Sequence, residues 1–487
     1  MFVKVFYINK AELMRSPKFL LLAILSVVAM QANAGNKIKY YFNHPPETSV
    51  STGVDAINLN GRIDDTLIAY INCAKYTLDI AVYNFTSYSG AGDLSNVVNA
   101  INAAYTRGVK IRWIHNGTTA TANTGLTTVN SAIPKLASPT GSAYNIMHDK
   151  FMVVDGHSPN PDESIVWTGS TNWSVAQFND DYDNVVIVQD SALAHAYIGE
   201  FNQMWGDTGM TYNLSNSKFG PDKVDLGRHN FTIDGKQVEL YFSPSDGTNN
   251  KIKTAILTAN KDLYFGVYTM TDNGCANSIA TVKMNGAYVA GIVDQYSNYS
   301  GNSAYATLTA NLGSNFITYT GSDLYHNKYV VIDPSDACSD PMVLTGSHNW
   351  TSAANTTNDE NTLIIHDATA ANIYLQAFRG DFYALGGNLT KVYGCTSGVQ
   401  NATEESTIVE IYPNPSSGDF TMTLDLASPQ KVTAYITDIS GRSFTVINDE
   451  WQPAGSMKKI VSVPVSGIYI LKIVTQNGVY NHQIIRN

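Results

Sequence analysis

Two eight-residue stretches of the chain place a histidine, a lysine and an aspartate at the same spacing, H-x-K-x4-D. The residues are His148, Lys150 and Asp155 in the first copy and His326, Lys328 and Asp333 in the second. An imidazole can attack phosphorus or transfer a proton, and an ammonium group can hold anionic oxygens. Because residues two apart in an extended segment face the same side, each histidine should share a pocket with its lysine. This chemistry suits cleavage of an anionic ester such as a phosphodiester.

A second repeated phrase follows each copy at a nearly equal distance. It reads T-G-S-T-N-W at 168–173 and T-G-S-H-N-W at 345–350. Two complete copies of both phrases do not arise by coincidence. We expect four side chains of this phrase to hydrogen-bond the substrate: Ser170, Asn172, Ser347 and Asn349. Trp173 and Trp350 are expected to pack in the interior, and His348 is the one other histidine placed to approach the pocket.

This duplicated signature resembles the phospholipase D superfamily, the HKD phosphodiesterases, over about residues 36–390. The resemblance implies an α/β fold of two pseudo-symmetric halves, with mixed sheets flanked by helices. It implies that His148 attacks phosphorus to form a phosphohistidine, that His326 protonates the leaving alcohol, and that no metal or other cofactor is needed. The near symmetry of the motifs leaves the reverse order open. Asp155 and Asp333 belong to the family's catalytic motif, although we expect them to bond the backbone rather than substrate.

The family also carries a downstream carboxylate that orients each histidine. Glu360-Asn361 fits that pattern here, and Asp183-Asn184 stands at the equivalent place in the first half. Asp183 lies 35 positions after His148, and Glu360 lies 34 positions after His326. A carboxylate on one ring nitrogen fixes the tautomer and stabilises the imidazolium. We therefore expect each carboxylate to orient the histidine of its own half.

The elements that must position these residues also repeat along the chain. Apolar, β-branched runs predict core strands, and apolar residues at helical spacing predict covering helices. The predicted strands are 38–42, 77–83, 109–114 and 185–188 in the first half and 238–242, 262–268, 287–293 and 362–365 in the second; the predicted helices are 94–107, 191–205, 277–284 and 368–385. Alternating strands and helices favour an α/β layer architecture.

The last part of the chain changes character. About seven short alternating strands predict a small all-β sandwich. Y-P-N-P-x-x-G at 412–418 and G-x-Y-x-L-x-I at 467–473 resemble the type A sorting domain of type IX secretion cargo in Bacteroidetes. This resemblance implies export to the cell surface or the medium, with the type IX secretion machinery as a partner. A generic accessory sandwich is the alternative.

The N-terminus also predicts export. Arg15 and Lys18 precede an apolar run at 19–30, and Ala-Asn-Ala at 32–34 forms a cleavage site, so we expect a signal peptide rather than a membrane anchor. Its removal takes away four basic residues and one acidic residue, which changes the net charge from −11 to −14. An acidic protein is not strongly attracted to polyanions.

The chain has four cysteines: Cys73, Cys275, Cys338 and Cys395. Their spacings fit no zinc site, and Cys338 and Cys395 are the pair expected to form a disulfide. The predicted segments are a signal peptide (1–34), a first half (35–210), a second half (211–390), a linker (391–407) and a β-sandwich (408–487).

The leading functional hypothesis is a secreted or cell-surface phosphodiesterase that hydrolyses a phospholipid to phosphatidic acid and an alcohol, with peripheral contact to a membrane. A metal-independent endonuclease with the same site is the alternative. A non-catalytic surface module is less favoured, because both motifs keep their histidine and lysine. Two motifs in one chain make a monomer sufficient for a complete site.

Overall fold

The computed structural model describes residues 36–86, 94–118, 120–141 and 144–389, followed by 408–414, 416–426, 428–438, 443–463, 465–475 and 478–486. The chain divides into two compact units, residues 1–395 and 396–487. The expected signal peptide at 1–34 and the expected linker at 391–407 lie outside the described residues.

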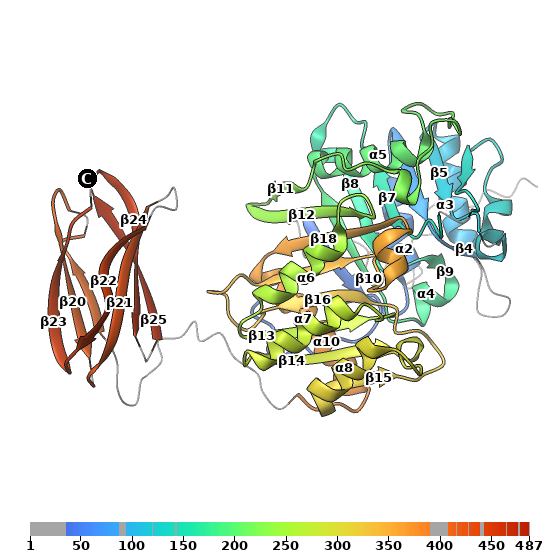
Figure 1. Cartoon of the computed structure of the whole chain (residues 1–487). Coiled ribbons are helices and arrows are strands. Elements are labelled where there is room, and N and C mark those ends of the chain that lie inside the picture. Colours follow the sequence, from blue (N-terminus) through green and yellow to red (C-terminus); the bar gives the residue numbers. More distant parts are fainter. Residues whose placement is uncertain are drawn as a thin grey trace, which may run out of the picture. The chain divides into compact units, whose positions relative to one another are not determined.

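The first unit contains two eight-stranded mixed sheets (Figure 1). In spatial order, the first sheet contains β2 (Ile57–Asn58), β1 (Ile38–Phe42), β10 (Asn184–Gln189), β8 (Ile165–Gly169), β7 (Lys150–Val154), β3 (Thr77–Val82), β5 (Lys110–His115) and β6 (Lys135–Ala137). The second contains β11 (Asn230–Ile233), β12 (Lys236–Ser243), β18 (Glu360–His366), β17 (Met342–Gly346), β16 (Lys328–Ile332), β13 (Asp262–Val267), β14 (Tyr288–Asp294) and β15 (Phe316–Tyr319).

From their second strands onward the two sheets correspond strand for strand. Each motif strand, β7 or β16, is a fully buried run of five residues at the centre of its sheet. Each pairs antiparallel with both of its neighbours. Burial on both faces explains why these strands are continuous apolar runs rather than alternating ones. The predicted α/β fold with two pseudo-symmetric halves is confirmed.

Helices cover the outer faces of the sheets, and two long helices pack between them. The helices α2 (Ile63–Cys73) and α3 (Ser95–Thr106) pack on the first sheet. The helices α6 (Thr248–Thr258), α7 (Asn273–Met284) and α8 (Ser303–Leu312) pack on the second. The helices α5 (Ser191–Trp205) and α10 (Ala368–Ala384) share one core with strands of both sheets. Periodicity in the sequence predicts α3, α5 and α10 closely and does not predict α2, α6 or α8.

The two central helices begin alike. Asp190 caps α5 by accepting the N–H of Leu193, and Asp367 caps α10 by accepting the N–H of Ala370. A carboxylate at this position satisfies a backbone donor that the helix leaves unpaired. Short elements complete the unit: β4 (Phe85–Thr86), β9 (Trp173–Ser174), α4 (Val175–Asn179) and α9 (Ser352–Thr356).

The second unit is all-β. Its described strands are β19 (Ile408–Tyr412), β20 (Phe420–Leu426), β21 (Gln430–Asp438), β22 (Ser443–Gln452), β23 (Gly455–Val461), β24 (Gly467–Thr475) and β25 (Gly478–Arg486). They form a three-stranded sheet, β19-β20-β23, and a four-stranded sheet, β22-β21-β24-β25, around a core of their own. This is the predicted small sandwich.

Cys73, Cys275 and Cys338 form no disulfide with one another, and Cys395 lies outside the described residues, so the pairing of Cys338 with Cys395 stays a prediction. None of the helices in the described part of the chain has the length and apolarity that crossing a bilayer requires.

Candidate active site

The two motif histidines lie at corresponding places, just before the start of a central strand. His148 is 6% exposed and His326 is 3% exposed. Of the two carboxylates, Asp183 immediately precedes β10 and Glu360 is the first residue of β18. In each sheet one antiparallel strand lies between this strand and the motif strand. The two strands therefore run parallel and start at the same edge of their sheet.

The carboxylates pair with the histidines of the opposite halves. The Nδ1 atom of His148 lies 2.7 Å from Oε2 of Glu360, and Nδ1 of His326 lies 3.0 Å from Oδ1 of Asp183. The expectation that each carboxylate orients the histidine of its own half is therefore wrong. A carboxylate oxygen only accepts, so each Nδ1 carries the hydrogen and each Nε2 presents its lone pair.

Backbone contacts between the halves explain the crossed pairing. The N–H of His148 donates to the carbonyl of Asp359 at 2.9 Å, and the N–H of Asp359 donates to the carbonyl of Ile146 at 3.1 Å. On the other side, the N–H of Tyr182 donates to the carbonyl of Leu324 at 2.8 Å. Each segment that precedes a histidine thus runs beside the segment that precedes the other half's carboxylate. Spacing along the chain carries no information about this contact.

The two asparagines that follow the carboxylates bridge the halves in the same crossed manner. Asn184 Nδ2 donates to Asn327 at 2.8 Å, and its oxygen accepts from Thr345 at 2.8 Å. Asn361 Nδ2 donates to Asp149 at 2.9 Å, and its oxygen accepts from Thr168 at 2.8 Å. These bonds are buried and satisfy both ends of each amide, so they fix the two motif segments against each other. Nothing in the sequence predicted this role for either asparagine.

The two lysines share the pocket with both histidines. Lys150 Nζ donates to the carbonyl of His148 at 2.7 Å, and Lys328 Nζ donates to the carbonyl of His326. Burial lowers the pKa of Lys150 to about 8, and burial together with the charge of Lys150 lowers the pKa of Lys328. Burial and both ammonium groups also hold the pKa of each histidine well below its ordinary value. The rings are therefore neutral in the free protein.

Two tyrosines that the sequence analysis does not assign to the site complete its walls. The ring of Tyr83 lies 5.0 Å from the ring of His148, and Lys150 Nζ lies 5.4 Å from its centre. The ring of Tyr268 lies 4.9 Å from the ring of His326, and Lys328 Nζ lies 4.9 Å from its centre. Tyr83 follows β3, and Tyr268 follows the equivalent strand β13. The internal repeat of the sequence could therefore have identified both tyrosines.

The hydroxyls of the two serines bond the carboxylates that orient the histidines. Ser170 Oγ donates to Asp183 at 2.5 Å and accepts the N–H of Asn184. Ser347 Oγ donates to Glu360 at 2.7 Å and accepts the N–H of Asn361. Each serine is fully buried and its hydroxyl both donates and accepts, so it holds the carboxylate in place, and its contact with substrate stays a prediction.

The neighbouring asparagines remain candidates for substrate contact. The side-chain oxygens of Asn172 and Asn349 are buried without a hydrogen-bond partner among the described residues. His348 is also buried, with neither ring nitrogen bonded within the described part of the chain. Trp173 and Trp350 belong to the two outer cores, as the packing prediction requires.

The motif aspartates lie at the far ends of the motif strands. Asp155 accepts the backbone N–H groups of Lys75, Tyr76 and Thr77 at 2.7–3.1 Å. Asp333 accepts those of Asn260, Lys261 and Asp262 at 2.8–3.2 Å. A five-residue strand separates each aspartate from its histidine, so the catalytic role that the family motif implies for them is wrong and the expected backbone role is observed.

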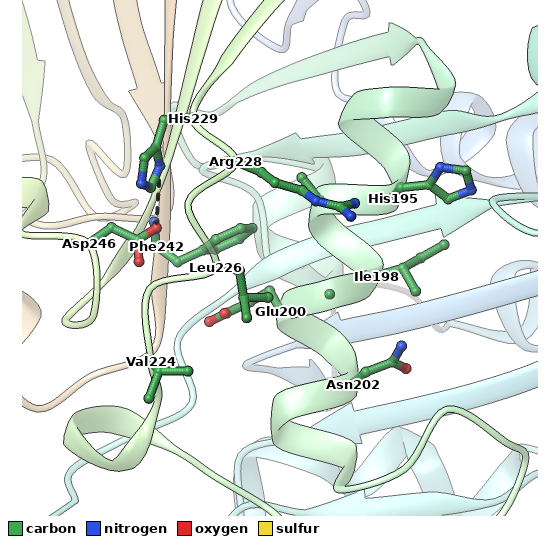
Figure 2. Close-up of a pocket in the computed structure, with 12 residues that line it drawn as sticks. His195, Ile198, Glu200, Asn202, Val224, Leu226, Arg228, His229, Phe242 and Asp246 are labelled. Carbon is green, nitrogen blue, oxygen red and sulfur yellow. Dashed lines mark hydrogen bonds and ion pairs between the residues drawn. The ribbon is translucent and has the colours of Figure 1, made fainter.

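A separate cavity of 470 Å³ lies between α5 and the 224–229 segment (Figure 2). None of the motif residues lines it.

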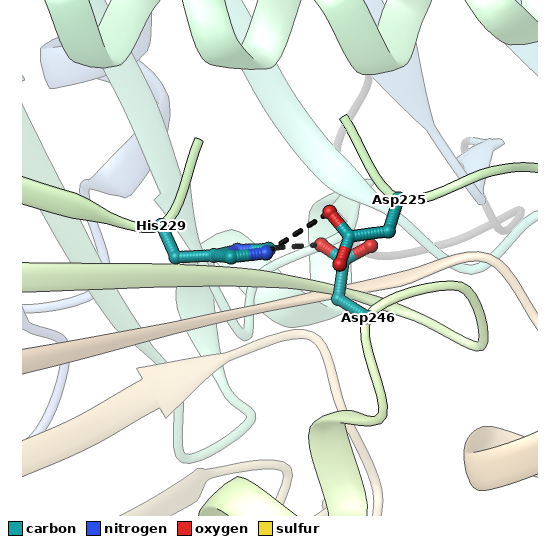
Figure 3. Close-up of side chains that lie close together, drawn as sticks. All are labelled: Asp225, His229 and Asp246. Atoms are coloured by element: carbon teal, nitrogen blue, oxygen red, sulfur yellow. Dashed lines mark hydrogen bonds and ion pairs between the residues drawn. The ribbon is translucent and has the colours of Figure 1, made fainter. Parts of the chain in front are cut away.

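Beside this cavity Asp225, His229 and Asp246 converge (Figure 3). His229 donates through Nδ1 to the carbonyl of Leu240 at 2.9 Å and through Nε2 to Asp225 at 3.0 Å. With both nitrogens used as donors, the ring has no lone pair for a metal, and the group is an ion pair.

Comparison with known proteins agrees with this architecture. The family model for the cardiolipin synthase, PLD-like domain matches residues 67–205 and 252–382, together more than half of the chain. The chain belongs to this phospholipase D-like family. The model for the secretion system C-terminal sorting domain matches residues 410–487. This phospholipase D-like protein is therefore type IX secretion cargo, exported to the cell surface or extracellular space.

Individual relatives of the phospholipase D-like protein are distant. It is 29% identical over 158 residues to a mitochondrial cardiolipin hydrolase of Xenopus laevis, covering 32% of this chain and 66% of that one. It is 27% identical over 168 residues to a phospholipase D of Rickettsia prowazekii, covering 34% and 75%. The match spans 57–66% of the length of three cardiolipin hydrolases. A phosphatidylserine synthase structure from Haemophilus influenzae is 14% identical, with a TM-score of 0.46 and coverage of 71% and 85%.

Proposed function

We propose that the protein hydrolyses phosphodiester bonds and that its substrate is a phospholipid, cleaved to phosphatidic acid and an alcohol. The observation that carries the proposal is the convergence of two neutral histidines, two lysines and two crossed carboxylates in one buried pocket. These groups supply a nucleophile, a proton donor and positive charge for the phosphoryl oxygens.

In the first step His148 Nε2 attacks phosphorus. The P–N bond forms while the P–O bond to the alcohol breaks, and protonated His326 gives its Nε2 proton to the alcohol oxygen. Substrate adds negative charge to the pocket, which favours the imidazolium form of His326 that this step needs. The ammonium groups of Lys150 and Lys328 hold the non-bridging oxygens, and Glu360 and Asp183 hold the rings in orientation.

In the second step water releases the phosphoryl group. Neutral His326 takes a proton from water, the water oxygen bonds to phosphorus, and the P–N bond to His148 breaks. Both histidines return to their starting states. The assignment of His148 as nucleophile follows the family, and the near symmetry of the pocket leaves the reverse order as a second arrangement for experiment to decide.

The rim on the His326 side favours a lipid with a cationic head group. Tyr296 is 58% exposed, and its ring lies 5.6 Å from that of Tyr268. Besides burial, the carboxyl group of Asp294 is the largest cause of the raised pKa of Tyr268, so a carboxyl group lies beside these rings. Aromatic faces next to carboxyls attract quaternary ammonium groups and repel polyanions. The names of the cardiolipin hydrolase and phospholipase D relatives point to the same substrate class.

Four predictions from the sequence stay open. A metal-independent endonuclease would use the same residues, and a non-catalytic surface module is the less favoured reading of complete motifs. Peripheral membrane contact follows from a lipid substrate, and a monomer follows from two motifs in one chain.

A turnover assay separates these functions. The purified protein is incubated in EDTA with phosphatidylcholine vesicles and with single- and double-stranded DNA. His148→Ala is the inactive variant, and His195→Ala, which changes an exposed histidine of the separate cavity, is the matched control. Choline release lost only in His148→Ala supports the phospholipase. DNA cleavage lost only in His148→Ala moves the same site to a nuclease, and inactivity on all substrates contradicts the proposed function.

A further inference from the structure

The surroundings of the two histidines differ in charge. Behind His148 lies a buried group that we name the Lys223 cluster: Lys223, Glu200, Asp359 and Asp149, each at most 5% exposed. At the positions that correspond to Asp149 and Asp359, the His326 side has Asn327 and Tyr182. The pseudo-symmetry of the pocket is therefore broken just behind one of the histidines.

Lys223 lies between the two halves and is bonded to both. Its Nζ is 2.9 Å from Asp359 Oδ1 and donates to the carbonyl of Ser243 at 2.9 Å. It also pairs with Glu200 of α5, which projects toward the 224–228 segment in Figure 2. The Lys223 side chain has no exposed surface, so its charge is balanced by these groups rather than by water.

Asp359 connects the Lys223 cluster to His148. Its side chain also accepts the N–H of Gly220 at 2.7 Å and the hydroxyl of Tyr144 at 2.7 Å. Its carbonyl accepts the N–H of His148 at 2.9 Å. The next residue, Glu360, places its carboxylate 2.7 Å from Nδ1 of the same histidine. A displacement of Asp359 would therefore disturb both the backbone and the ring of His148.

We propose that Lys223 is a positioning residue for His148: its ammonium holds Asp359 in place and thereby fixes the segment that presents Glu360 to the histidine. Without this charge Asp359 would be a buried carboxylate lacking its cation, and it would move toward solvent or take up a proton. His326 lacks this dependence, because the residue before its carboxylate partner Asp183 is the uncharged Tyr182 rather than an aspartate that needs a cation.

The first test is independent of turnover. The full chain is labelled with [13Cε1]histidine, and the two signals are assigned with His148→Asn and His326→Asn. Lys223→Met is expected to shift the His148 signal and leave that of His326 in place. Asp359→Asn, which keeps the Lys223–Glu200 pair, is expected to act alike and serves if Lys223→Met does not fold. Lys236→Met, which removes a partly buried pair with Asp367 at 3.0 Å, is the matched control and should shift neither signal.

The second test rests on the proposed function. Lys223→Met should lower kcat about 100-fold while KM changes less than about threefold, because misplacing the histidine affects the chemical step more than binding. An unshifted His148 signal, equal shifts of both histidines, or wild-type kcat in Lys223→Met would overturn the positioning role. If the wild-type protein cleaves no phosphodiester, the proposed function fails and the histidine signals alone decide the role of Lys223.

Discussion

At the scale of single residues, the crossed pairing assigns each carboxylate to a step of the reaction. If His148 is the nucleophile, its partner Glu360 acts in phosphoenzyme formation, and Asp183 acts with His326 in protonation and release. Glu360→Gln should therefore resemble His148→Asn and form little phosphoenzyme, with turnover lowered about 10²–10⁴-fold. Asp183→Asn should resemble His326→Asn and accumulate phosphoenzyme. Rapid quench with 32P-labelled substrate measures the covalent species.

The control for this comparison is Glu239→Gln, because Glu239 pairs with the partly buried His366 at 2.9 Å, outside the pocket. It should leave phosphoenzyme formation unchanged. If phosphoenzyme accumulates in the Glu360→Gln variant and none forms in the Asp183→Asn variant, His326 is the nucleophile instead. Equal behaviour of the two variants would contradict a division of labour between the histidines.

The titration of the pocket sets a second expectation at this scale. Burial raises the pKa of Asp183 to about 6, and this carboxyl must be ionised to hold the imidazolium of His326. Burial lowers the pKa of Lys150 to about 8, and its ammonium must be protonated to hold the phosphoryl oxygens. The profile of kcat/KM, which reports the free protein, should therefore fall below about pH 6 and above about pH 8.

The variant Lys150→Arg tests the alkaline side of this profile. A guanidinium stays charged throughout the range, so the decrease near pH 8 should move to higher pH even if activity is lower overall. An unchanged alkaline limb would show that another group, such as Lys328, produces it. A flat profile from about pH 5 to 9 would contradict both assignments.

At the scale of elements, the aspartate at the end of each motif strand stabilises the fold. Asp155 and Asp333 adopt positive φ angles of 51° and 48° and bind three consecutive backbone N–H groups of the segment before β3 or β13. Asp155→Ala should lower the free energy of unfolding by about 2–4 kcal/mol, because three partly buried backbone donors lose a charged acceptor. Urea denaturation measures this loss.

The matched variant is Asp155→Asn, which tolerates the same backbone conformation and keeps an acceptor. It should lose less stability than Asp155→Ala, and both should keep wild-type kcat per folded molecule. A loss of kcat at unchanged stability would return Asp155 to the catalytic set.

At the scale of the whole molecule, catalysis and export belong to separate units. The sorting domain has its own core and lies in a compact unit that begins at residue 396. Deletion of residues 408–487 should leave kcat/KM within about twofold of the full chain, because each unit buries its own apolar surface. The same deletion should keep the protein inside the outer membrane. Cell fractionation and assay of each fraction measure both effects.

The reciprocal variant is His148→Ala in the full chain, which should be exported normally and show no turnover. Activity lost with the deletion would mean that the tail supports the catalytic unit. Export of the deleted chain would mean that the sorting signal lies elsewhere.

The sequence by itself determined the two motifs, the central strands and helices, the α/β class and the sorting domain. These features depend on local periodicity and on spacing within one half, and both are readable along the chain. The helices α2, α6 and α8 escaped prediction, and their faces pack on the outer sides of the sheets.

Only the tertiary structure decided how the halves meet. Glu360 serves His148 and Asp183 serves His326 because neighbouring backbone segments bond across the interface. The same contact turned Ser170 and Ser347 toward the carboxylates and brought Lys223 behind one histidine alone. In a chain with two similar halves, equal spacing within each half is compatible with either pairing. The packing of one half against the other selects between them.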